Sequence, residues 1–375
     1  MVRWLEAFSR RRGRGLCLAA MLAAALLAGC RTAGYYGQAI RGQWQILAGR
    51  QPIPKVLDDP AAGESLKQRL QLVTRIRQFA ERELKLPANG HYQSYVDVGR
   101  RHVVWNVYAA PEFSLEAKTW WYPVVGRLKY RGYFSEAGAR ECAARLARQG
   151  YDTYVGGVDA YSTLGWFRDP VLNTFIHYPE EELAGVIFHE LAHQKLFCAG
   201  DTDFNEAFAT VVEETGVRRW LQSAGPPELA RRHEESLRFE DAFQRLLAQT
   251  RQQLQELYAA RPGRGGENGA DADESTLAAR RRRKAEIFSA LQNDYARLRA
   301  HWPTATHRDR WMTSHLNNAK LASQDAYYRL VPGFRRLWEG QGNDPEAFHR
   351  AAGSLAHLPK AERHRRLQSL EDNSR

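Results

Sequence analysis

Residues Val186–Thr210 read VIFHELAHQKLFCAGDTDFNEAFAT, and the rest of the chain is interpreted outward from them. The stretch holds His189 and His193, a glutamate beside the first histidine, and Glu206 thirteen residues after the second. Residues four apart lie on one face of an α-helix, so both imidazoles can point at one place. The pattern is typical of a metal site, and the alternative is two ordinary helices with polar side chains.

The metal interpretation assigns each polar residue a role. His189, His193 and Glu206 are ligand types that zinc accepts, and three protein ligands leave a fourth position for water. Glu190 is next to the first ligand and is predicted to take a proton from the activated water and pass it to the leaving amine. Apolar neighbours favour a buried position for the histidines, where imidazoles need partners. We expect one Zn²⁺ per chain.

Glu206 also has a purely structural interpretation. Asp203 and Glu206 have the spacing of a capping box, in which the glutamate side chain bonds to the backbone of its own helix. That arrangement would leave the metal without its third ligand. Both interpretations begin a helix at this point of the sequence.

The N-terminus has the features of a bacterial lipoprotein signal peptide. Arginines precede an apolar run, Leu16–Gly29, of 14 residues, whereas a membrane span needs about 20. The run ends in LAGC, which resembles a lipobox, so Cys30 is expected to carry acyl chains and to become the mature N-terminus. The alternative is a signal peptide that merely contains a cysteine. Acyl chains would anchor the protein to the lipid bilayer without a span.

The signal peptide also changes the charge balance. The formal charge is +11 for the whole chain and +7 once residues 1–29, with five arginines and one glutamate, are removed. Export and the lack of a recognisable module argue against nucleic acid as a partner. The expected location is the cell envelope, with the catalytic domain in the periplasm and the anchor in the outer rather than the inner membrane. Cys142 and Cys198 either form a disulfide or are separate buried thiols.

The pattern of the mature chain predicts an α+β fold. We expect a small, mostly antiparallel sheet packed on the HExxH helix, followed by a helical C-terminal subdomain, and this arrangement resembles that of the zincins. The expected division is a signal peptide over 1–29, a lipidated N-terminus and stem over 30–54, an α+β metallopeptidase core over 55–225, a helical subdomain over 226–345 with a flexible loop at 261–275, and a charged tail over 346–375 that is partly disordered after Pro359.

Local signals place the elements. Aromatic and β-branched residues predict strands between Tyr92 and Phe134, and YDTYVGGV and VLNTFIHY predict two more. Ser135 is expected to cap a helix running to Gln149, and Pro179 to open the HExxH helix. The strand DPVLNTFIHY offers an edge for an extended peptide. The five basic residues from Arg280 to Lys284 predict a solvated face, with contact to anionic lipid as the alternative.

These motifs carry a resemblance to known enzymes. HELAH followed by NEAFATVVEE resembles the gluzincin metallopeptidases, and NExFA is similar to the segment of the aminopeptidase N type. Over about Tyr35–Phe334, the segments GQWQILAGRQPI, PVVGRLKYRGYF, AYSTLGWFRDPVL and NNAKLAS resemble a bacterial family of putative aminopeptidases, many of them lipoproteins. The resemblance implies a membrane-anchored zinc aminopeptidase acting on peptides, with His189, His193 and Glu206 as zinc ligands and Glu190 as general base.

Two departures from the aminopeptidase N type keep alternatives open. Only twelve residues separate His193 from Glu206, which is a shorter interval, and no GxMEN segment is present to hold the free amine of a substrate. A zinc endopeptidase, or a non-catalytic binding or assembly lipoprotein on the same fold, are therefore the competing functions. Tyr327 is the first candidate for the oxyanion donor and Tyr161 the second. Asn205, Thr210 and Glu213 are interpreted first as ordinary helical positions; the alternative is that Glu213 orients a ligand histidine and that Asn205 and Thr210 support the site.

Overall fold

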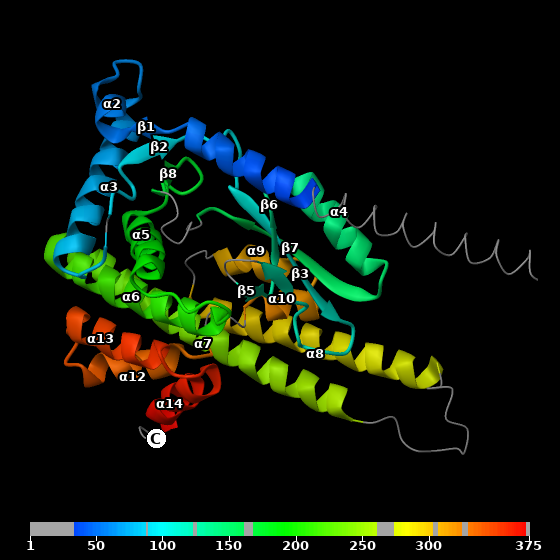
Figure 1. Ribbon diagram of the computed structural model, residues 1–375. Coiled ribbons are helices and arrows are strands. Elements are labelled where there is room, and N and C mark those ends of the chain that lie inside the picture. The colour runs from blue at the N-terminus through cyan, green and yellow to red at the C-terminus, as the bar shows by residue number, and fades with distance from the viewer. Residues whose placement is uncertain are drawn as a thin grey trace, which may run out of the picture. The chain divides into compact units, whose positions relative to one another are not determined.

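A computed structural model describes residues 34–87, 89–122, 126–160, 168–260, 274–302, 307–324 and 329–372. The chain divides into two compact units, Met1–Gly49 and Arg50–Arg375. The described part of the first unit is a helix over residues 34–48, the darkest blue segment in Figure 1. None of the described helices combines the length and the apolar character that a membrane span requires. The predicted signal peptide and Cys30 lie outside the described residues.

The second unit is mixed α+β and mostly helical, which confirms the predicted α+β class. Its helices are α2 (Ile53–Asp58), α3 (Glu64–Arg82), α4 (Glu136–Ala147), α5 (Glu180–Lys195), α6 (Thr202–Ala224), α7 (Pro227–Ala259), α8 (Glu274–Ala300), α9 (His307–Thr313), α10 (Asn318–Ala322), α12 (Val331–Gly340), α13 (Pro345–Ala356) and α14 (Lys360–Asp372). Its strands are β1 (Gln51–Pro52), β2 (Ser94–Val96), β3 (Val104–Pro111), β4 (Trp120–Tyr122), β5 (Gly126–Leu128), β6 (Arg131–Tyr133), β7 (Tyr151–Val158) and β8 (Val171–Leu172).

The described strands form three small sheets rather than the single sheet expected. The order β6-β3-β7 is antiparallel throughout, β4 and β5 form an antiparallel pair, and β1-β2-β8 mixes an antiparallel with a parallel pair. Strand β3 is buried along almost its whole length, and both α4 and α10 contact it. Ser135 caps α4 as predicted, because its side chain accepts a hydrogen bond from Gly138 N. The helix ends two residues earlier than expected, at Ala147.

The strand predicted from DPVLNTFIHY is wrong beyond its first residues. Strand β8 covers only Val171 and Leu172, and the backbone N–H groups of Phe175 and Ile176 then turn back to the carbonyl of Leu172. The Asn173 side chain explains the change of direction, because it accepts from Val98 N at 2.9 Å and donates to Arg100 O at 3.3 Å. So short a strand does not offer the edge for an extended peptide that the sequence suggested.

Helix α5, which carries HExxH, is packed between α3 and α6. Pro179 stands at its N-cap rather than at its first turn, and three glutamates follow in that turn, where the helix dipole favours negative charge. The ring centroid of Phe79 in α3 lies 6.0 Å from that of Phe188 in α5 and 5.2 Å from that of Trp220 in α6. These apolar contacts fix the buried side of α5, so its histidines are held by a rigid helix.

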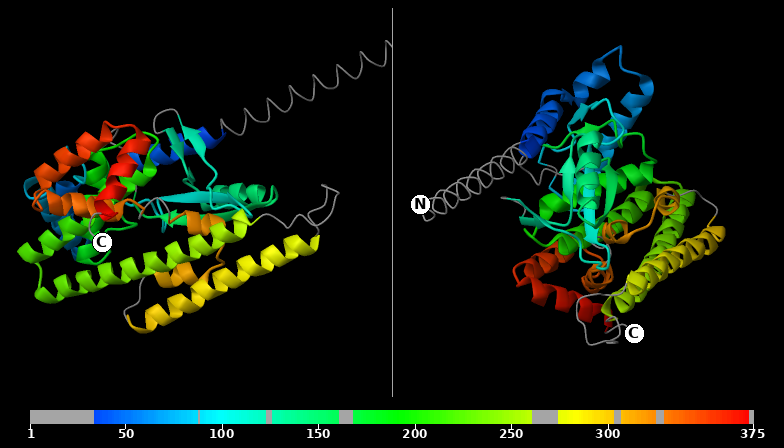
Figure 2. Two further views of the ribbon diagram at one scale, coloured as in Figure 1. Left: turned by 90° about the horizontal axis from the view of Figure 1, so that it is seen from below. Right: turned by 90° about the vertical axis from the view of Figure 1, so that its right-hand side faces the viewer.

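The C-terminal region is helical, as predicted, and more ordered than predicted. Helices α7 and α8 run side by side in every view (Figures 1 and 2) and share an apolar core. The expectation of disorder after Pro359 is wrong, because Lys360–Asp372 form helix α14 against α12.

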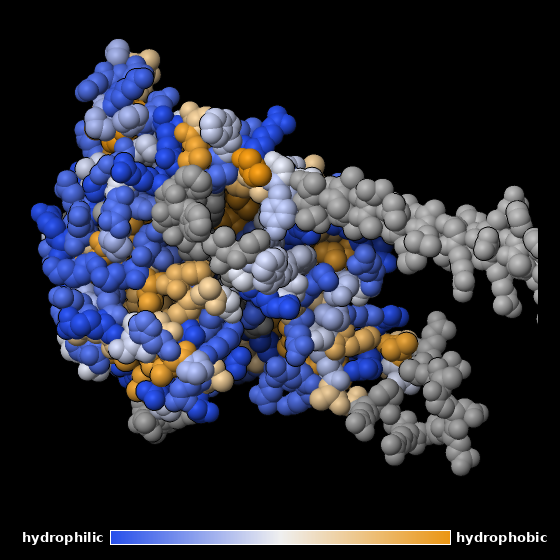
Figure 3. Space-filling model, viewed as in Figure 1, coloured by the Kyte–Doolittle hydropathy of each residue, from blue (hydrophilic) through white to orange (hydrophobic). Residues whose placement is uncertain are grey.

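Cys142 and Cys198 are both free and buried, which agrees with the two-thiol alternative. Hydrophilic side chains make up most of the face in Figure 3.

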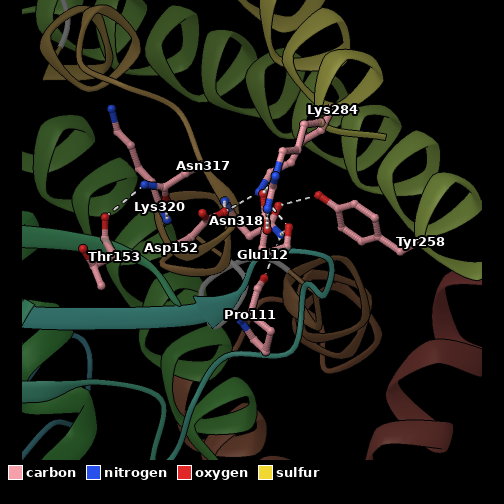
Figure 4. Close-up of polar contacts among 10 residues, drawn as sticks. Pro111, Glu112, Asp152, Thr153, Tyr258, Lys284, Asn317, Asn318 and Lys320 are labelled. Atoms are coloured by element: carbon pink, nitrogen blue, oxygen red, sulfur yellow. Dashed lines mark hydrogen bonds and ion pairs between the residues drawn. The ribbon is translucent and has the colours of Figure 1, made fainter. Parts of the chain in front are cut away.

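A polar network ties the helical region to the end of strand β3 (Figure 4). The Asn318 side chain donates to Pro111 O at 3.1 Å and to Glu112 O at 2.9 Å. The ammonium of Lys284 donates to Glu112 O at 2.7 Å and to Asp152 Oδ2 at 2.6 Å. The predicted solvated face at residues 280–284 therefore holds only in part, because the arginines at 281–283 are exposed whereas Lys284 is buried.

Candidate metal centre

Helices α5 and α6 bring the three predicted ligands together. His189 and His193 come from successive turns of α5 and Glu206 from the start of α6. His189 Nε2 lies 3.3 Å from Glu206 Oε2, and His193 Nε2 lies 3.8 Å from Glu206 Oε1. One ligand atom from each residue lies within 4.8 Å of the others. Two imidazole nitrogens and a carboxylate thus converge on one point, which is a donor set that fits zinc.

The capping-box interpretation of Glu206 is wrong. Helix α6 begins at Thr202, so Asp203 lies inside its first turn and Asp201 occupies the N-cap position. The carboxylate of Asp203 accepts instead from Lys129 Nζ at 2.7 Å. Glu206 directs its carboxylate at the two histidines of the neighbouring helix rather than at its own backbone. This side chain is therefore available to the candidate metal centre.

Glu213 lies beside His189, and this contact favours the alternative to an ordinary helical position. Two turns after Glu206 on α6, its Oε2 atom accepts a hydrogen bond from His189 Nδ1 across 2.9 Å. With one proton held on Nδ1 by Glu213, the proton that a metal would displace is the one on Nε2, which faces Glu206 and His193. The hydrogen bond therefore fixes both the tautomer and the ring orientation that a metal would need.

Several contacts hold the short connection between helices α5 and α6, which are called the metal helices because they carry the three candidate ligands. Asn205 accepts from Cys198 N at 2.7 Å and donates to Cys198 O at 2.9 Å, so it supports the loop rather than a ligand. Gly200 has a φ of +78°, which the tight turn requires. Asp201 binds His364 of α14 at 2.9 Å. These contacts explain how twelve residues suffice between His193 and Glu206. Thr210 is buried within α6.

Burial and mutual charge shift the pKa values at the centre. Burial alone would raise the pKa of Glu206, but the histidines outweigh it and hold that pKa below its ordinary value. Burial likewise opposes protonation of His189, yet its hydrogen bonds with Glu206 and Glu213 raise its pKa well above the ordinary value. Burial lowers the pKa of His193 to about 4 and, with neighbouring carboxylates, raises that of Glu190 to about 8.

A pocket of about 270 Å³ opens beside the centre. Its lining includes His189, Glu190 and Glu213 from the metal helices. The remaining lining residues are Asp159, Ala160, Phe175, Tyr178 and Val186. Glu190 thus faces the same space as a candidate ligand, which is the position that a general base needs. The described lining residues contain three acidic side chains and no lysine or arginine, and the charges of Asp159 and Glu213 favour a cationic group.

Asp159, which the sequence did not single out, is held firmly in this pocket. One carboxylate oxygen is bonded to His102 Nδ1 and the other accepts from the hydroxyl of Tyr178. His102 lies directly over Gly157, where a Cβ atom would collide with its ring. Burial and the bond to Asp159 raise the pKa of Tyr178, so its phenol stays protonated. The available signal in the sequence was an acidic residue directly after a strand.

Three predicted residues cannot be located. Tyr327, Tyr161 and Cys30 all lie outside the described residues. The predicted roles of these three residues stay predictions.

Comparison with known proteins agrees with the resemblance. No curated protein and no solved structure gave a significant match. A family model described as "Putative aminopeptidase" matches residues 34–367, which is most of the chain. The match extends from the helix at 34–48 through the metal helices and into α14. The chain therefore belongs to the putative aminopeptidase family.

Proposed function

We propose that the protein is a zinc-dependent peptidase of the zincin type, and an aminopeptidase in particular. The observation that carries the proposal is the convergence of His189, His193 and Glu206, whose ligand atoms lie within 4.8 Å of one another. Two nitrogens and a carboxylate without a thiolate suit zinc, and three protein ligands are typical of a catalytic rather than a structural site. When bound, zinc would supply Lewis-acid activation of water and of the scissile carbonyl.

The chain's own residues would move the proton. Glu190 lines the pocket beside His189 and is not among the ligand atoms that converge. The positive charge of a bound zinc ion would lower the raised pKa of Glu190, so that its carboxylate can accept a proton from the attacking water. The same group would then deliver that proton to the leaving amine. Glu213 would keep His189 oriented throughout, because it holds the opposite ring nitrogen at 2.9 Å. Tyr327 remains our candidate for the oxyanion donor.

The acidic pocket supports exopeptidase action. The substrate of an aminopeptidase presents a free α-ammonium group close to the scissile bond. Asp159 and Glu213 line the pocket that Glu190 also lines, and Asp159 is fixed by His102 and Tyr178. A carboxylate accepts about four hydrogen bonds, so Asp159 retains capacity for an ammonium group. Asp159 would then hold the free amine of the substrate, which is the task of the GxMEN glutamate in the aminopeptidase N type.

We also propose that the protein is lipid-anchored at Cys30 in the bacterial cell envelope, with the catalytic domain in the periplasm and the anchor in the outer membrane. The signal-like residues 1–29 and the LAGC sequence support this location. Mass spectrometry of the protein isolated from membranes tests it, because acylation adds a defined mass to an N-terminal Cys30. A protein that retains residues 1–29, or an unmodified Cys30, would contradict the anchor.

The peptidase proposal is tested by mass spectrometry of a defined peptide mixture after incubation with the zinc-loaded protein and, in parallel, with Glu190→Gln. We expect one-residue ladders from free N-termini with the wild-type protein and none with the variant. Internal cuts would retain the zinc mechanism and replace aminopeptidase by endopeptidase. No cleavage by a folded protein with zinc bound would favour a non-catalytic binding or assembly lipoprotein.

A further inference from the structure

The helix over residues 34–48 exposes large hydrophobic side chains along one face. Tyr36, Ile40 and Trp44 follow one another at intervals of four residues, and their exposed fractions are 38%, 70% and 68%. Residues four apart share a helix face, so the three side chains form one apolar stripe. Surface helices of globular proteins normally turn polar residues to the solvent. An exposed apolar stripe of this kind indicates an interaction surface.

The exposure is concentrated on this helix. Among the described residues, large hydrophobic side chains are exposed at five positions, and three of them make up the apolar stripe. The other two, Trp121 and Phe197, are far apart in the sequence and both belong to the second unit. The stripe is therefore a local property of the N-terminal helix rather than a general feature of this surface.

The chemistry of the segment matches a membrane surface. Tyrosine and tryptophan are the side chains that favour the boundary between lipid and water, because each joins an apolar ring to a polar group. No acidic residue occurs from Arg31 to Leu57, and the basic residues in that interval are Arg31, Arg41, Arg50 and Lys55. Arg41 is exposed and directly follows Ile40. Positive charge beside an apolar stripe favours anionic headgroups.

The position of the helix in the chain brings it close to lipid. Gly34, its first residue, is four residues after Cys30. An extended chain covers at most about 3.5 Å per residue, so an acylated Cys30 would hold the start of the helix within about 14 Å of its acyl chains. The stripe would then act as a second membrane signal beside the acyl chains.

We infer that the apolar stripe of helix 34–48 lies in the interface of an anionic lipid bilayer, with the helix parallel to the membrane and Arg41 among the headgroups. This role goes beyond peptide hydrolysis and rests in part on the proposed anchor at Cys30. The stripe itself is observed independently of that anchor.

The test is flotation of a chain that begins at Arg31 with vesicles of phosphatidylethanolamine and phosphatidylglycerol. This chain keeps every described residue and lacks both Cys30 and the preceding apolar run. We expect it to bind these vesicles, more weakly at high salt and more weakly still to phosphatidylcholine vesicles. The double substitution Ile40→Glu with Trp44→Glu should lower binding at least about tenfold. Trp121→Glu, at a side chain 63% exposed in the second unit, is the matched control and should bind like the parent.

Each other outcome overturns the inference. Absence of flotation, or equal binding by the double variant, would remove the bilayer as the partner of the stripe. A dimer that dissociates in the double variant, without vesicle binding, would assign the stripe to a second copy of the chain. Circular dichroism of the variants checks that they are folded. Because this assay uses neither acylation nor peptide cleavage, it can fail while the proposed anchor and the peptidase function both hold.

Discussion

At the scale of single residues, the two ring nitrogens of His189 have different partners. Nε2 faces Glu206, and Nδ1 is bonded to Glu213 at 2.9 Å. Groups that hold a ligand histidine in this way usually contribute tenfold to a hundredfold to metal affinity. We therefore expect Glu213→Gln to weaken zinc binding about 10- to 100-fold while the protein stays folded, measured by competition with a chelator. Glu182→Gln, on the exposed side of α5, should bind zinc normally, and equal affinities for both variants would contradict the role of Glu213.

Asp159 provides the residue-scale test of amine recognition. A hydrogen bond to a charged group contributes about 1.5–3 kcal/mol, so Asp159→Asn should lower kcat/KM for peptides with a free N-terminus about 10- to 100-fold. Binding of such a peptide to the zinc-free protein should weaken as well. N-acetylated peptides of the same sequence should bind both proteins equally. Asp159→Glu, which retains the charge, should recover part of the preference. An unchanged preference in Asp159→Asn would leave Asp159 with the structural task of holding His102 and Tyr178.

These residues also show what the sequence could predict at this scale. His189, Glu190 and His193 share one helix, so helical spacing alone predicts their common face. Glu206 and Glu213 follow seven residues apart on the next helix, and the same periodicity predicts their common direction. Asp159 meets His102 and Tyr178 only because β7 pairs with β3 and the chain then turns back after β8. Such long-range contacts have no periodic signal in the sequence.

At the scale of helices and strands, the close approach of α5 and α6 depends on a missing side chain. A Cβ atom at Gly216 would lie 2.7 Å from Leu84 and 2.8 Å from Phe188. Overpacking of this kind costs about 1–3 kcal/mol, so Gly216→Ala should lower the free energy of unfolding by that amount in chemical denaturation. Gly353 of α13, also helical, has open space around its Cβ position. Gly353→Ala should be neutral or stabilising, and similar effects at both sites would argue against tight packing at Gly216.

Elements differed in how well their sequences defined them. Strand β7 has the predicted bounds, Tyr151–Val158, and the start of α4 follows its serine cap. The strand expected after Asp169 was lost because the side chain of Asn173 bonds to two backbone groups outside its own segment. Helix α14 was missed because its polar sequence resembles a disordered tail, and its order comes from contacts with distant residues such as Asp201. Local patterns therefore predict elements best where their stabilising contacts are also local.

At the scale of the whole second unit, charged residues far apart in the sequence hold the metal helices in place. Lys360, Arg363 and His364 of α14 surround Asp201, which is only 2% exposed and precedes α6. Arg335 of α12 pairs with Glu214 at 2.7 Å and with Asp241 of α7 at 2.9 Å. Helices α12 and α14 thus stabilise the position of α6 in the candidate metal centre, although they contribute none of the three converging ligands.

His349 of α13 makes the stability of the folded protein depend on pH. It lies buried on α13, 5.9 Å from the ring of Phe208, with Lys195 of α5 and Asp344 as the charged groups that act on it. Burial, assisted by the positive charge of Lys195, lowers the pKa of His349 to about 4, although Asp344 acts in the opposite direction. The folded protein therefore holds this imidazole neutral, whereas the unfolded chain protonates it at the ordinary pKa of about 6.5.

The sign of the pH effect follows from proton counting. Between pH 6.5 and about 4 the unfolded state binds the proton and the folded state does not, so stability falls as the pH falls through this interval. Above pH 6.5 and below about 4 the contribution is constant. We expect His349→Gln to remove about 2 kcal/mol of the stability lost between pH 7 and pH 4.5, measured by urea denaturation in the presence of a chelator. Comparison with the parent cancels the other titrating groups, including His193. A parent and a variant that lose equal stability over this interval would show that His349 takes up its proton without unfolding the protein.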